Sequence, residues 1–148
     1  MIEVMKEFKL RCAHKLCNLP QGHKCMKMHG EYYTIRLYLR VKGKPTQTLP
    51  QHGMLLDFGD IKDIFNEVIF SRYDHATLIK SDDHLLPFLQ QENQKLVILD
   101  YPPTAECMSE LIYNDLKSRI PSLHKVEVVE SEGCHAAYIA DDEKEWSV

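Results

Sequence analysis

The sequence has no long run of hydrophobic residues; its uninterrupted apolar stretches are short, such as residues 96–99. A membrane-spanning helix needs roughly 20 consecutive apolar residues, so we expect no contact with a membrane. The N-terminus also lacks a basic region followed by an apolar stretch, which argues against a secretory signal. We therefore predict a cytoplasmic protein.

Basic residues are not in excess either. The 18 Lys and Arg residues stand against 22 Asp and Glu, which gives a formal net charge of −4. Nucleic-acid binding needs clustered basic side chains, so we predict no nucleic acid as the main partner. Five cysteines are an odd number, which does not fit a disulfide framework and agrees with a reducing compartment.

Internal repeats, low-complexity segments and charge blocks are absent as well. A length of 148 residues suits one domain with its own core, and we predict a single domain over residues 1–148. The chain is 44% hydrophobic and 27% charged, as in ordinary globular proteins, and it carries eight histidines.

Two long strands are predicted in the first third of the chain. Residues 4–14 have an extended character, and residues 29–42 alternate apolar and polar side chains. A turn-rich loop separates them. A final antiparallel pair is predicted around Gly133, and residues 96–99 are a candidate for a short buried strand.

Apolar residues spaced three and four positions apart predict two amphipathic helices. The first runs from Asp57 or Asp60 to residue 73, and either carboxylate can cap it. The second runs from Thr104, a plausible N-cap, to about residue 120. The order of strands and helices predicts an α+β fold.

His29 and Glu31 lie two residues apart at the start of the clearest strand, so their side chains project to one face. His14 ends the preceding strand, and that strand should pair across the loop with the strand that carries His29. Two imidazoles and a carboxylate on adjacent strands can hold a metal and leave coordination positions open. From spacing alone, exposed or hydrogen-bonded histidines are the simpler interpretation.

Other residues have the chemistry for proton transfer or ligand binding. Cys25 lies in a polar loop beside a lysine, and a nearby cation favours a reactive thiolate. Asp74 directly precedes His75, and a carboxylate can orient an imidazole as a proton shuttle. Glu106 and Glu130 are placed to accept N–H groups from a guanine-like or pterin-like ring. Structural or solvent-exposed roles remain open for all five.

Together these residues belong to an ordered set of motifs. It comprises a pattern like F-x-A-A-H-x-L at 8–16, G-H-K-C-x-x-x-H-G at 22–30, G-M-L-L-D-F at 53–58, Asp74-His75, P-T-x-E at 103–106, and Glu130 with Tyr138. This set resembles the 6-pyruvoyl-tetrahydropterin synthase family. The three-residue gap between Cys25 and His29 is similar to that of its bacterial branch, which makes 6-carboxytetrahydropterin for queuosine biosynthesis; pyruvoyl-forming enzymes tend to have a longer gap.

The resemblance implies a tunnelling fold (T-fold): a four-stranded antiparallel sheet with two helices on one face. It implies a homohexamer of two trimers, with barrels closed by neighbouring subunits and sites built between them. It also implies the conversion of 7,8-dihydroneopterin triphosphate to 6-carboxytetrahydropterin, acetaldehyde and triphosphate. In the family, zinc binds the hydroxyls of the substrate side chain and acidifies the adjacent C–H bonds.

The resemblance also implies roles by position. They are His14 and His29 as metal ligands, Cys25 as general base, Asp74 and His75 as proton relay, Glu130 as pterin anchor, and Glu106 as a supporting pterin residue. The family's third metal histidine is Glu31 here. We predict that Glu31 ligates and that the site tolerates Mn²⁺ or Fe²⁺ beside Zn²⁺, because carboxylate oxygen is a harder ligand. The alternative is that Glu31 turns away and water or His23 replaces it.

The sequence departs from the family pattern at Ile79, where an Asn is usual, and in the polar stretch 80–95, a longer form of a variable loop. Two other functions stay open: a pyruvoyl-forming synthase, and a non-catalytic paralogue that binds metal or pterin. Retention of the base and the relay argues against the paralogue. Candidates for holding the triphosphate are His23, Lys24, Lys27 and Arg36.

Overall fold

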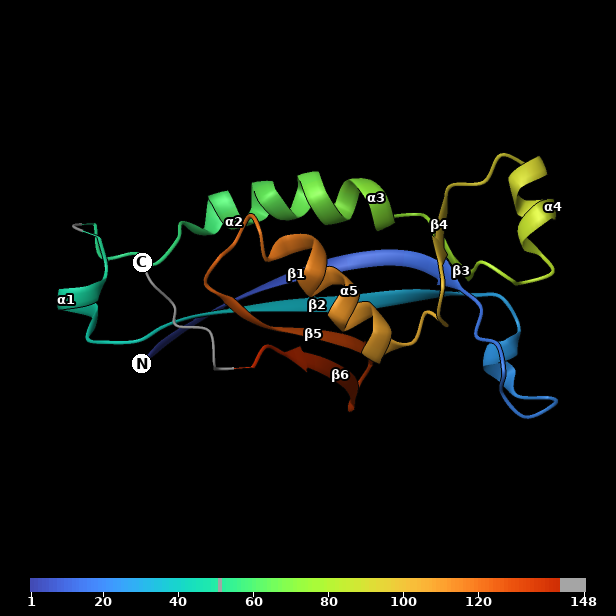
Figure 1. Cartoon of the computed structure of the whole chain (residues 1–148), viewed down its shortest axis with the longest axis horizontal. Coiled ribbons are helices and arrows are strands. Elements are labelled where there is room, and N and C mark those ends of the chain that lie inside the picture. Colours follow the sequence, from blue (N-terminus) through green and yellow to red (C-terminus); the bar gives the residue numbers. More distant parts are fainter. Residues whose placement is uncertain (51, 142–148) are drawn as a thin grey trace.

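A curled sheet of six strands organises the protein (Figure 1). The structure is a computed structural model that describes residues 1–50 and 52–141. The strand order is β4-β3-β1-β2-β5-β6, so the two longest strands lie side by side at its centre.

The antiparallel part of the sheet contains the strands that the sequence predicts. β1 (Ile2–His14) pairs with β2 (His29–Val41) along its whole length, which places His14 opposite His29. β2 then pairs with β5 (Leu123–Ser131), and β5 pairs with β6 (Cys134–Ile139). A turn at Gly133, whose φ of 75° suits glycine, joins the last two strands.

The prediction of a four-stranded sheet is wrong, because two short strands extend it beyond β1. β3 (Thr77–Lys80) runs parallel to β1, and β4 (Leu96–Leu99) runs parallel to β3. Parallel strands need a crossover connection, which here contains α4 (Leu86–Gln91). The polar stretch 80–95 therefore connects β3 to β4, and it contains the helix α4.

Two helical segments cover one face of the sheet (Figure 1). The first is continuous through α2 (Phe58–Phe65), the π-helical turn η2 (Asn66–Phe70) and α3 (Ser71–Tyr73), and Asp57 caps it by accepting from the Gly59 N–H. The second is α5 (Ala105–Leu116), capped by the Thr104 hydroxyl. α5 ends four residues before the predicted position. Two short turns, η1 (Lys24–Met26) and α1 (Pro45–Thr48), lie in loops.

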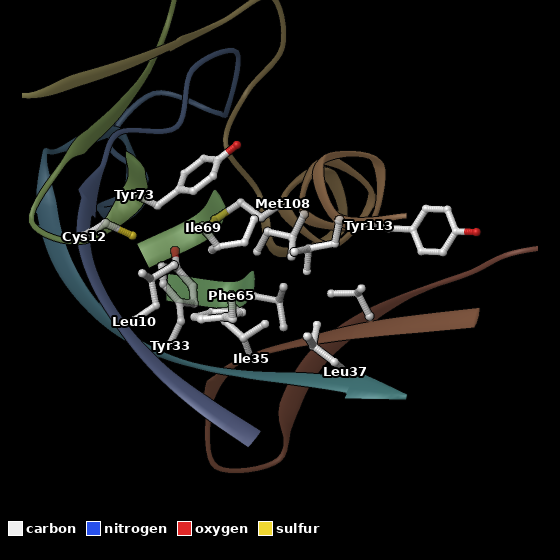
Figure 2. Close-up of a cluster of buried hydrophobic side chains, with 14 of the residues drawn as sticks. Leu10, Cys12, Tyr33, Ile35, Leu37, Phe65, Ile69, Tyr73, Met108 and Tyr113 are labelled. Carbon is white, nitrogen blue, oxygen red and sulfur yellow. The ribbon is translucent and has the colours of Figure 1, made fainter. Parts of the chain in front are cut away.

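The core lies between this sheet face and the helices (Figure 2). Leu10, Ile35 and Phe65 are among its fully or almost fully buried members, and each such side chain contributes about 1.5–3 kcal/mol on burial. Burial raises the pKa of the Cys12 thiol to about 12, with the nearby Asp74 carboxylate acting in the same direction. Cys12 is therefore an inert apolar side chain. No helix in the part of the chain that the structure describes is long and apolar enough to cross a bilayer.

Candidate functional site

The ends of β1 and β2 bring two histidines together beside the core. The β1–β2 register sets them opposite one another, and the Nε2 atoms of His14 and His29 lie 2.9 Å apart. His14 is buried, whereas His29 is partly open to solvent. The pairing of β1 with β2 thus brings His14 and His29 together, as the sequence predicts.

Main-chain carbonyl groups orient both rings. His14 Nδ1 lies 2.9 Å from the Pro103 oxygen, and His29 Nδ1 lies 2.7 Å from the Lys27 oxygen. A carbonyl oxygen only accepts, so each Nδ1 carries the hydrogen and each Nε2 presents a lone pair. Burial lowers the pKa of His14, although the Pro103 carbonyl acts in the opposite direction. When both rings carry only the Nδ1 hydrogen, they face each other through acceptor atoms.

Two carboxylates complete this group. Glu31 Oε1 lies 3.5 Å from His29 Nε2, because positions two apart on β2 share a face. Glu130, on β5, places its Oε1 3.8 Å from His14 Nε2. The donor atoms of His14, His29, Glu31 and Glu130 all lie within 4.8 Å of one another.

This donor set fits a divalent metal. Imidazole nitrogen suits Zn²⁺, Fe²⁺ and related ions, and carboxylate oxygen extends the range to Mn²⁺. Opposed Nε2 lone pairs repel each other unless a cation lies near them, and the two carboxylates supply compensating charge. His23 is not a member of the group, and its Nδ1 accepts a hydrogen bond of 3.2 Å from the Cys25 N–H.

The sequence did not indicate Glu130 as a possible ligand, since its motif pointed to pterin binding. Its place in the group depends on the pairing of β2 with β5, which joins residues about a hundred positions apart. Tyr33 was also missed. Its hydroxyl lies 3.1 Å from His14 Nδ1 and adds to the orientation of that ring.

Cys25 lines a cavity of about 650 Å³ next to this cluster. The loop that carries Cys25 is fixed by a 3.0 Å hydrogen bond from the Leu16 N–H to the Cys25 oxygen and by the turn η1. The cavity is lined by Lys24, Cys25, Lys27, His29, Glu31, Glu130, Ser131 and Cys134. A thiol and three of the four donor residues therefore share one space.

A second cavity, of about 400 Å³, also borders the cluster. Glu106 and Glu130 both line it, together with His14. The two predicted pterin-binding carboxylates therefore share a hollow that could take a flat ring. Glu130 borders both cavities.

Asp74 and His75 form a close pair at the end of α3. Asp74 Oδ2 lies 2.5 Å from His75 Nδ1, and Asp74 Oδ1 accepts from the Arg11 N–H at 3.2 Å. His75 adopts a left-handed φ of 56°, a costly conformation that is common at functional sites. Its side chain is 72% exposed and lines a third cavity, which shares only Glu31 with the Cys25 cavity.

The chain matches known proteins over most of its length. The family model described as 6-pyruvoyl tetrahydropterin synthase matches residues 3–141. A 6-carboxy-5,6,7,8-tetrahydropterin synthase of Haemophilus influenzae is 31% identical over 123 residues, which cover 79% of this chain and 83% of that protein. One of the same name from Aquifex aeolicus is 26% identical over 136 residues, 80% of each.

The fold also has a close match among solved structures. An uncharacterized protein from Wolinella succinogenes superimposes with a TM-score of 0.79 at 20% identity, covering 95% of this chain and 98% of that one. At this identity the match establishes the common fold alone.

Proposed function

The chain belongs to the 6-pyruvoyl tetrahydropterin synthase family, whose model spans residues 3–141, and from this we propose that it is a 6-carboxy-5,6,7,8-tetrahydropterin synthase. It is a lyase that converts 7,8-dihydroneopterin triphosphate to 6-carboxytetrahydropterin, acetaldehyde and triphosphate, in queuosine biosynthesis. The names of the Haemophilus and Aquifex relatives support this choice over the pyruvoyl-forming reaction.

One observation carries the proposal: three members of a group of four possible metal donors share a cavity with Cys25. His14, His29 and Glu31 hold a divalent ion, which we take to be Zn²⁺, with Mn²⁺ or Fe²⁺ tolerated because of the carboxylate. A metal bound there would polarise the side-chain oxygens of the substrate and acidify the neighbouring C–H bonds.

Cys25 is the general base in this proposal. Its loop holds it beside the donor set, where a thiolate can take a proton from the substrate side chain. Asp74 orients His75, which relays protons. Because His75 borders a different cavity in one subunit, the pair serves the site of a neighbouring copy in a homohexamer of two trimers.

Glu130 and Glu106 hold the pterin. A carboxylate can accept two N–H groups from the pyrimidine edge of that ring. The cavity that these residues share adjoins His14, so a ring bound in it would direct its side chain towards the donor set and Cys25. Glu130 is the main anchor because it borders both cavities.

Incubation with 7,8-dihydroneopterin triphosphate and measurement of acetaldehyde test the proposal. Stoichiometric acetaldehyde supports it. A pyruvoyl product without acetaldehyde would instead identify the pyruvoyl-forming reaction. If no substrate is consumed with Zn²⁺, Mn²⁺ or Fe²⁺, the protein is a non-catalytic paralogue.

A further inference from the structure

We propose that Lys24 and Lys27 bind the triphosphate group of the substrate at the cavity that holds Cys25. The inference rests on the proposed function, since it takes a triphosphate ester as the ligand. Both lysines line that cavity, and both are exposed to solvent.

The loop fixes the main chain of these two lysines on either side of Cys25. The Lys27 N–H donates to the Lys24 oxygen at 3.1 Å, which closes the turn η1. The Lys27 oxygen in turn accepts from His29 Nδ1 at 2.7 Å. The lysines are therefore anchored to the base and to a candidate metal ligand by short stretches of ordered chain.

The two lysines supply the ammonium groups of this cavity, and Glu31 and Glu130 supply its carboxylates. The carboxylates of Glu31 and Glu130 face the two imidazoles, at 3.5 and 3.8 Å. Neither lysine forms an ion pair with a carboxylate in residues 1–50 or 52–141. Two ammonium groups without an acidic partner thus remain, and lysine is a common ligand of phosphate groups.

The other basic candidates are occupied elsewhere. Arg36 lies on the opposite face of β2, where its guanidinium is 3.0 Å from both Glu7 and Glu127. His23 accepts from the Cys25 N–H and thereby caps η1. Of the four residues that the sequence offers for holding the triphosphate, only Lys24 and Lys27 remain.

The experiment measures binding of inorganic triphosphate by calorimetry to the metal-loaded protein. Lys24→Gln, Lys27→Gln and the double variant are compared with Lys62→Gln, which removes an exposed lysine from α2, away from the cavity. Each cavity variant should bind about tenfold more weakly, and the double variant about a hundredfold, as expected for charged hydrogen bonds. Lys62→Gln should bind as the wild type does. Metal content is measured after each titration because triphosphate chelates metals.

Equal affinity in the wild type and the double variant, at equal metal content, would overturn the proposal. Lys24→Arg and Lys27→Arg keep the charge and should retain most of the affinity. If they bind as weakly as the glutamine variants, the loss comes from the shape of the loop and the proposal is wrong.

The two proposals fail in different ways. Triphosphate binding through these lysines without acetaldehyde release would contradict only the proposed function. Acetaldehyde release with an unchanged KM for 7,8-dihydroneopterin triphosphate in the double variant would contradict only the role of the lysines.

Discussion

His14 and His29 face one another through their Nε2 atoms at 2.9 Å, while main-chain carbonyl oxygens occupy both Nδ1 positions. The arrangement leaves two acceptor lone pairs opposed at the junction of two strands. A bound cation would remove that repulsion, so the relationship between these rings explains why the protein should be more stable with metal than without it.

We therefore predict that His29→Gln loses metal and the stabilisation that comes with it. Free metal at a hundred times its Kd should stabilise the wild type by about 2.7 kcal/mol. Metal analysis and thermal unfolding with and without Zn²⁺ measure both effects. His52→Gln, on an exposed loop, is the control and should keep both. An unchanged metal content in His29→Gln would rule out the assigned site.

Glu31 should set the choice of metal. Glu31→Ala is expected to weaken binding at least about tenfold, the cost known even for groups that only support a ligand. Glu31→His, which restores the usual family residue, should increase the preference for Zn²⁺ over Mn²⁺ because imidazole is the softer donor. Competition between the two ions measures this preference. A strict zinc preference that Glu31→Ala leaves intact would contradict ligation by Glu31.

Cys25→Ala should lower turnover by about 10²- to 10⁴-fold, the usual contribution of a general base. Its metal content should be unchanged, because the thiol is not one of the four donor groups. Acetaldehyde release and metal analysis on the same sample separate the two effects. Cys134→Ala removes the other thiol in the cavity and should retain most of the activity. The reverse pattern would assign the base to Cys134.

The buried Asp83 should make stability depend on acid pH. Burial acts to raise its pKa, but hydrogen bonds from Lys15 and from the Leu85 N–H outweigh that effect and lower the pKa. Its stabilising contribution is present above the unfolded pKa of about 3.9 and is lost as the pH falls through the lower folded value.

We predict that Asp83→Asn lowers the free energy of unfolding by about 1–3 kcal/mol at pH 7. The difference from the wild type should shrink as the pH falls below about 4. Urea denaturation at several pH values measures it. Asp82→Asn alters an exposed pair with Lys80 and should cost much less than Asp83→Asn. A difference between the wild type and Asp83→Asn that stays constant down to low pH would contradict the lowered pKa.

Local patterns predict the central strands and both long helices well. The alternation of residues 29–42 and the caps at Asp57 and Thr104 depend on neighbours in sequence, and each corresponds to an observed element. β3 was missed because four residues show too little periodicity, and its pairing with β1 joins distant parts of the chain.

The sequence likewise predicts one part of the candidate site and not another. The grouping of His14, His29 and Glu31 follows from adjacent strands and a two-residue spacing. Two other placements needed the tertiary structure. Glu130 joins the donor set only through the β2–β5 register, and the cavity of His75 is formed by residues of β1 and β2 together with the start of β3.

The π-helical turn η2 bears on how many residues this segment needs. The core residues Ile61, Phe65, Ile69 and Tyr73 recur at every fourth position, whereas an α-helix has about 3.6 residues per turn and would drift by about 40° at each step. The wider turn corrects that phase, so all four reach the core. Deleting one exposed residue between Phe65 and Ile69 would leave the four core residues 4, 3 and 4 positions apart, a spacing that an ordinary α-helix keeps on one face. The segment could therefore lose one exposed residue, such as Glu67, by closing the π-helical turn into an α-helix while its core contacts stay in phase.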